Sequence, residues 1–135
     1  MNNSQRKIFD RELEQILLAF PDHLQVLLEE VPLIVEDEPS SVLLQEMGLT
    51  SKGFVLCGLH SGIPLTERSV HISARLPDRL MLFRGPIMWV AGFAHDGRGG
   101  GSLGQLQRQI RITILHEIGH HFGLDEDDLV KLGYG

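Results

Sequence analysis

The chain has 135 residues, which suits one domain with its own hydrophobic core and is too short for two. Its hydrophobic content of 42% is that of an ordinary globular protein, and its formal net charge of -6 at pH 7 disfavours binding to nucleic-acid phosphates. No apolar run reaches the roughly 20 residues of a membrane-spanning helix, so neither nucleic acid nor a membrane is an expected partner.

Cysteine usage indicates a reducing compartment. Cys57 is the only cysteine, so an internal disulfide cannot form. Residues 1–7 are polar and basic and lead into an amphipathic stretch, unlike the apolar region of a signal peptide. We therefore expect a cytoplasmic protein.

The first part of the chain predicts two helices and a strand. Apolar residues recur at helical spacing over residues 4–20, and Pro21 separates this helix from a second one that runs to about Glu30. Residues 33–35 are apolar, two of them β-branched, and predict a strand, and a short helix over 41–47 ends at Gly48. The polar side of the first helix is expected to carry Arg11, Glu12, Glu14 and Gln15.

The middle of the chain predicts two further strands, 54–59 and 80–83, with turn residues starting at Ser61. Either strand could pair with the main chain of an extended peptide. Residues 86–94 are apolar all round and predict a buried helix, with Trp89 in the core. The glycine-rich segment 95–101 lacks the Lys-Ser/Thr ending of a phosphate-binding loop, so we expect a linker.

The longest helix is predicted over 103–122. Ser102 and Gln105 have the spacing of a capping box at its start. A row of apolar residues at four-residue spacing is expected to face the core, and Thr113, His116 and His120 occupy the neighbouring stripe, which would face a cleft. A short closing helix is expected over 129–132.

The stretch His116-Glu117-Ile118-Gly119-His120 predicts hydrolytic chemistry. Residues four apart on a helix project from one face, so His116 and His120 can bind one zinc ion. Glu117 lies about 100° further round the helix, beside the metal, where it can act as general base. With one more protein ligand, the ion keeps a position for a water molecule, whose pKa falls to about 7.

The third zinc ligand is expected after Gly123, a residue suited to the left-handed conformation that reverses a chain at a helix end. Of the acids that follow, we predict Glu126 as the ligand, with Asp125 as the alternative. His121 cannot share the ion and is expected behind the ligands or on the surface. Candidates for a transition-state donor are His60, His71, His95 and Tyr134, although each histidine also fits an ordinary loop residue.

Three segments carry a family resemblance: 116–126 (HEIGHHFGLDE), 58–69 (GLHSGIPLTERS) and 76–84 (LPDRLMLFR). They resemble the small bacterial zincin-like metallopeptidases, or minimal zincins, whose extended motif is H-E-x-x-H-x-x-G-x-x-D/E. The resemblance covers most of the chain from about residue 32 onward. The last motif position is usually Asp in that family, and the Glu here is one methylene longer, so either the turn differs slightly or Asp125 substitutes.

The resemblance implies zinc ligands at His116, His120 and Glu126, with Glu117 as the base. It also implies a single α+β domain over residues 1–135, in which a small mixed β-sheet packs against helices that include the active-site helix. Residues 62–69 are expected to shape the cleft. The expected activity is zinc-dependent hydrolysis of a peptide or protein substrate. The alternatives are a metal-binding protein with little or no peptidase activity and a purely structural domain without metal.

Overall fold

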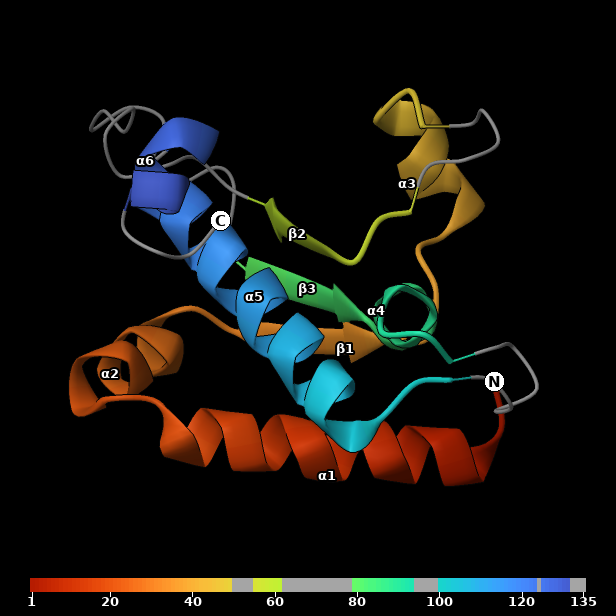
Figure 1. Cartoon of the computed structure of the whole chain (residues 1–135). Helices are drawn as coiled ribbons and strands as arrows, with labels where there is room; N and C mark the ends of the chain where they lie inside the picture. The colour runs from red at the N-terminus through yellow and green to blue at the C-terminus, as the bar shows by residue number, and fades with distance from the viewer. Residues whose placement is uncertain (50–54, 62–78, 94–99, 124, 132–135) are drawn as a thin grey trace.

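The fold is known from a computed structural model, which describes residues 1–49, 55–61, 79–93, 100–123 and 125–131. A three-stranded mixed sheet and the helices around it make up this part of the chain (Figure 1). The predicted α+β class with a small mixed sheet is therefore confirmed. Within the described part of the chain, no helix has the length and apolar character needed to cross a membrane.

The sheet has the strand order β1-β3-β2. Strand β1 (Leu33–Glu36) runs parallel to β3 (Arg79–Phe83), and β2 (Gly58–Ser61) runs antiparallel to β3. Strand β3 is thus central, and β2 is an edge strand among the described residues. The strand predicted over 54–59 begins later, at Gly58, and extends through Ser61, which was expected to start a turn; Phe54 lies outside the described residues.

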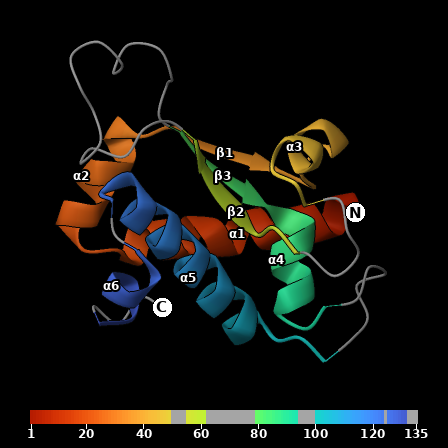
Figure 2. The ribbon, with the colours of Figure 1, turned by 90° about the horizontal axis from the view of Figure 1, so that it is seen from above.

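The helices cover one face and both ends of the sheet (Figures 1 and 2). Helix α5 lies along the strands, α1 passes beneath it, and α3 and α6 stand at opposite ends of the molecule. The bounds are α1 Asn3–Ala19, α2 Asp22–Glu30, α3 Ser41–Glu46, α4 Arg84–Val90, α5 Leu103–His121 and α6 Glu126–Lys131.

Helix α5 supplies the centre of the core. It begins at the predicted capping box. The Ser102 side chain accepts a hydrogen bond from the backbone N–H of Gln105, and the Gln105 side chain accepts one from the backbone N–H of Ser102. Leu80 and Leu82 alternate with Met81 along β3 and are fully buried. The other fully buried aliphatic side chains of the core are Ile87, Leu106, Ile110 and Ile114. The predicted apolar row of α5 is therefore confirmed as the face that packs inward.

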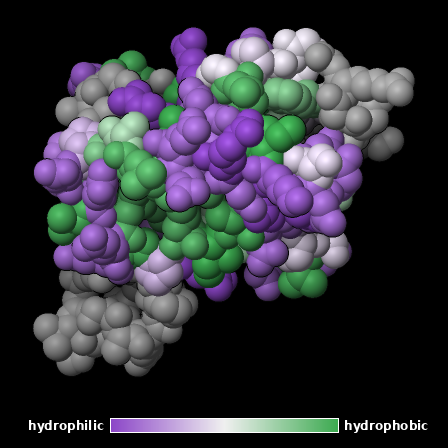
Figure 3. Space-filling view, turned by 90° about the horizontal axis from the view of Figure 1, so that it is seen from below, coloured by the Kyte–Doolittle hydropathy of each residue, from purple (hydrophilic) through white to green (hydrophobic). Residues whose placement is uncertain are grey.

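Helix α1 differs from its prediction at Glu12. This residue was assigned to the polar face, yet it is 2% exposed, because α1 packs against α5 and Glu12 accepts a hydrogen bond from Gln107 Nε2 across that contact. Arg11, Glu14 and Gln15 are exposed as expected. In the space-filling view from below, hydrophilic side chains cross the middle of the face, the region that α1 occupies (Figure 3).

Helix α4 is shorter and less buried than predicted. It ends at Val90, and only one of its sides packs inward, through Ile87 and Met88. Trp89 is 52% exposed, so its predicted place in the core is wrong. The indole instead lines a surface hollow together with Leu44 of α3 and Leu56, which precedes β2.

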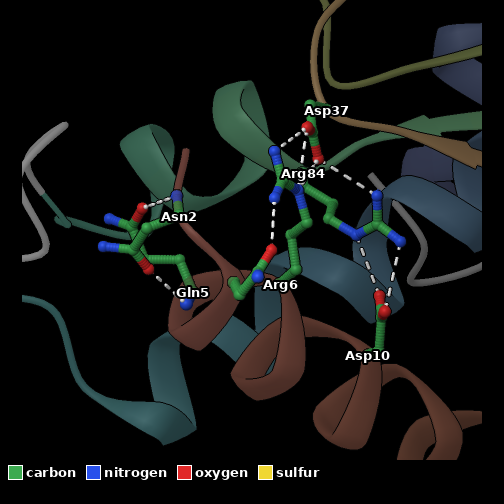
Figure 4. A network of polar contacts seen from close by, with 7 residues as sticks. Asn2, Gln5, Arg6, Asp10, Asp37 and Arg84 are labelled. Carbon is green, nitrogen blue, oxygen red and sulfur yellow. Dashed lines mark hydrogen bonds and ion pairs between the residues drawn. The ribbon is translucent and has the colours of Figure 1, made fainter.

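A charged network joins α1, the end of β1 and the start of α4 (Figure 4). Asp37 accepts hydrogen bonds from Arg6 Nη2 at 2.8 Å and from Arg84 Nη1 at 3.1 Å. Arg84 also donates from Nε to Asp10 at 2.9 Å. The hydrogen bonds from Arg6, and then those from Arg84, lower the pKa of Asp37 below its ordinary value of 3.8. Two arginines thus share one carboxylate where three elements meet.

We expect Asp37→Asn to lower the thermal midpoint at pH 7, since Arg6 loses its anionic acceptor and Arg84 keeps only Asp10. A carboxyl group whose pKa is lowered on folding stabilises the fold above its unfolded pKa, and that stabilisation is lost as pH falls through the lower, folded value. The difference in thermal midpoint between the variant and the wild type should therefore shrink as pH falls below 3.8. Thermal melts at pH 7 and pH 3 measure this, with the exposed Glu14→Gln on α1 as control; a difference equal at both pH values would contradict it.

Candidate metal centre

The last turns of α5 bring His116, Glu117 and His120 together. The two imidazole rings lie edge to face, with centroids 4.4 Å apart and planes inclined at 68°. One potential ligand atom from each of the three residues lies within 4.8 Å of the others. The helix therefore places both histidines on one face, as their four-residue spacing requires.

The Glu117 carboxylate lies between the two imidazoles and strand β2. Its Oε1 atom is 3.3 Å from His116 Nδ1, and its Oε2 atom is 3.3 Å from His120 Nδ1. Oε2 also accepts a hydrogen bond from the backbone N–H of His60, with an N···O distance of 2.8 Å. Glu117 is only 7% exposed, whereas the side chains of His116 and His120 are 27% and 37% exposed. The carboxylate is buried, and the imidazoles are partly exposed to solvent.

Two further histidines lie beside the site, and of these only His60 differs from its prediction. His60 was expected in a loop, but it belongs to β2, and its ring Nε2 is 3.3 Å from His121 Nδ1. His121 is 7% exposed, so it is buried beside the site. The spacing of Thr113, Glu117 and His121, four residues apart, gave a signal for a second inward stripe on α5. The contact with His60 had no local signal, because the two residues are 61 positions apart.

The chain reverses after α5 as predicted. Gly123 has φ 77°, the left-handed conformation that glycine adopts readily, and α6 begins at Glu126. The closing helix therefore starts three residues before the predicted 129. Asp125 is exposed and directly precedes α6. The Glu126 side chain lies outside what the structure describes, as do His71, His95, Tyr134 and residues 62–69.

The donor set suits zinc. Two imidazoles with a nearby carboxylate match the nitrogen and oxygen ligands that zinc takes in proteins, while calcium and magnesium prefer oxygen ligands throughout. Cys57 lies just before β2, and its burial, together with the charge of Glu117, raises the pKa of its thiol to about 11. The thiol is therefore protonated at neutral pH, and Cys57 is not among the residues that converge at the site.

We expect Cys57 to react with iodoacetamide about 100-fold more slowly at pH 8 than a thiol with the ordinary pKa of 9.0, because the thiolate fraction falls tenfold for each pKa unit. Restricted access would slow it further. Mass spectrometry of the alkylated protein over time measures the rate, and unfolding in urea should restore the ordinary rate. Equal rates in the folded and unfolded protein would contradict the raised pKa.

Comparison with known proteins supports the chemistry of this site. A family model described as zincin-like metallopeptidase matches residues 28–134, which include the three described strands and the whole of α5. No match to a curated protein was found.

Proposed function

The chain belongs to the zincin-like metallopeptidase family, and from this premise we propose that it hydrolyses peptide bonds with one zinc ion. The ligands in this proposal are His116, His120 and Glu126. The observation that carries it is the convergence of His116, Glu117 and His120 at the end of α5, beside an edge strand.

Bound there, zinc would polarise the scissile carbonyl and lower the pKa of water to about 7. Glu117 would accept the proton of the attacking water and pass it to the leaving amine. Its position supports this role, because the carboxylate is 3.3 Å from each ligand imidazole and is oriented by the His60 amide. The 7% exposure of Glu117 also limits competition from bulk solvent for its oxygens.

Strand β2 is the platform we propose for the substrate main chain. The alternative strand, β3, is hydrogen-bonded to β1 on one side and to β2 on the other, so it has no edge to offer. An extended peptide could pair with the outward main-chain groups of β2 other than the His60 N–H, which already donates to Glu117, and it would then lie beside that carboxylate. Main-chain pairing tolerates many side chains, so we propose unstructured segments of proteins as the substrate class. The single cysteine suits the cytoplasm as the place of action.

The direct test is to incubate the zinc-loaded protein with a panel of unstructured proteins and to identify the cleaved bonds by mass spectrometry. We expect cleavage that stops when a chelator removes zinc and resumes when zinc is restored. If the protein retains zinc at His116 and His120 but cleaves no member of the panel, a metal-binding role without peptidase activity replaces this proposal. If elemental analysis finds no zinc, the site is structural.

A further inference from the structure

Strand β2 approaches α5 unusually closely at Gly58. A Cβ atom built on this glycine would lie 2.7 Å from Thr113 Cγ2, 3.0 Å from the Met81 carbonyl oxygen and 3.3 Å from Glu117 Cγ. The first distance is far below van der Waals contact, so any side chain at this position would push the strand and the helix apart. Glycine at position 58 therefore sets how near β2 comes to Glu117.

The register of β2 explains why the His60 amide reaches the carboxylate. Cys57 accepts the Phe83 amide, so the main-chain groups of residue 57, and by alternation those of Leu59, face β3. The groups of Gly58 and His60 consequently face the outer edge of the sheet. The outward N–H of His60 is the one that donates to Glu117 Oε2 at 2.8 Å.

Side chains also tie this strand to the helix. Residues 58 and 60 lie on the same face of β2, and Gly58 shows that this face is directed toward α5. The His60 imidazole therefore meets the buried His121 of α5, with Nε2 and Nδ1 3.3 Å apart and ring centroids 5.2 Å apart. The strand is held against the helix on both sides of the amide that contacts Glu117.

We propose that Gly58 and His60 are positioning residues for Glu117: the close approach at Gly58 allows the His60 amide to fix the orientation of the carboxylate. A glutamate has three rotatable side-chain bonds, and its helix alone leaves the carboxylate free to rotate between rotamers. The amide of β2 removes that freedom at Oε2 and leaves Oε1 facing His116. The effect of this contact on catalysis rests on the proposed function, whereas the hydrogen bond from His60 to Glu117 does not.

The first test is a pair of compensating substitutions in the zinc-loaded protein. Gly58→Ala should lower kcat by about 10- to 100-fold, since small displacements of a catalytic group have effects of this size, while zinc affinity changes less than about twofold. Thr113→Ser removes the clashing methyl group but keeps the hydroxyl that donates to the Gln109 carbonyl at 2.8 Å. The double variant should recover part of the lost kcat, because the approach to the Met81 carbonyl oxygen at 3.0 Å remains. A Gly58→Ala variant with unchanged kcat, or a double variant no better than the single one, would overturn the proposal.

The second test needs no peptidase activity, so it separates failure of this inference from failure of the proposed function. Hydrogen exchange of the His60 amide, followed by NMR, should be slow in the zinc-loaded wild type and at least tenfold faster in Glu117→Ala, which lacks the acceptor. Leu59, whose amide faces β3, is the internal control and should not change. Gly58→Ala should also speed exchange at His60, and the added Thr113→Ser should slow it again. An amide that exchanges equally fast in the wild type and in Glu117→Ala overturns the inference, whatever the activity.

Discussion

Glu117→Gln should lower kcat by about 100- to 10,000-fold, the range that a positioned general base contributes. Glutamine has nearly the same shape, and its amide oxygen can still accept the His60 N–H that now donates to Oε2 at 2.8 Å. What it loses is the ability to take a proton from water. We therefore expect zinc affinity and the thermal midpoint to stay close to those of the wild type. Steady-state kinetics on a peptide cleaved by the wild type measure the effect.

The control for this variant is Glu29→Gln, which neutralises an exposed glutamate at the end of α2. It should keep full activity. If Glu117→Gln is as active as this control, Glu117 is not the base. If it loses zinc as well as activity, Glu117 is a ligand of the ion. The experiment has to distinguish a ligand from a base, because the carboxylate is 3.3 Å from both imidazoles.

His120→Ala should weaken zinc binding by more than about 100-fold. Loss of a group that merely supports a zinc ligand costs 10- to 100-fold in affinity, and loss of the ligand itself must exceed that. His116→Ala should behave in the same way, because the centroids of the two rings are only 4.4 Å apart and both imidazoles would bind the same ion. A ligand that binds only the folded state raises its stability, so zinc should raise the thermal midpoint of the wild type and not that of either variant. Competition with a chromophoric chelator gives the affinities.

His23→Ala is the matched control for these substitutions. His23 is an exposed histidine in the first turn of α2, outside the cluster formed by His116, Glu117 and His120. Its loss should leave zinc affinity unchanged. A weakened affinity in His23→Ala, or an unchanged one in His120→Ala, would mean that zinc binds elsewhere on the chain.

Local sequence signals predicted much of the site. The four-residue spacing of His116 and His120 predicted that they share one face of a helix. The Ser102 capping box correctly marked where that helix begins, and Gly123 marked where the chain turns back after it. The strands at 33–35 and 80–83 were also recognised, because short β-branched or apolar runs next to proline carry their own signal.

The features that were missed depend on contacts between distant segments. Glu12 was predicted from the sequence as a surface residue of α1, but Gln107 of α5 packs against it. Trp89 was predicted in the core, but only one side of α4 packs inward and Trp89 lies on the other. His60 reads as a loop histidine because nothing near it in the chain shows that its amide meets Glu117, 57 residues away. Periodicity describes a single helix or strand, whereas the burial and contacts of these residues depend on the segments that pack beside it.

The proposed zinc site combines two imidazoles of α5 with a carboxylate from beyond Gly123 and leaves one position of the ion open to water. A crystal structure of the zinc-loaded protein, with anomalous data collected at the zinc edge, tests it most directly. We predict one strong peak, with His116 and His120 nitrogens and a Glu126 oxygen at about 2.0–2.2 Å and a water molecule in the fourth position. A peak away from these histidines, or an ion enclosed by four protein ligands, would contradict the account.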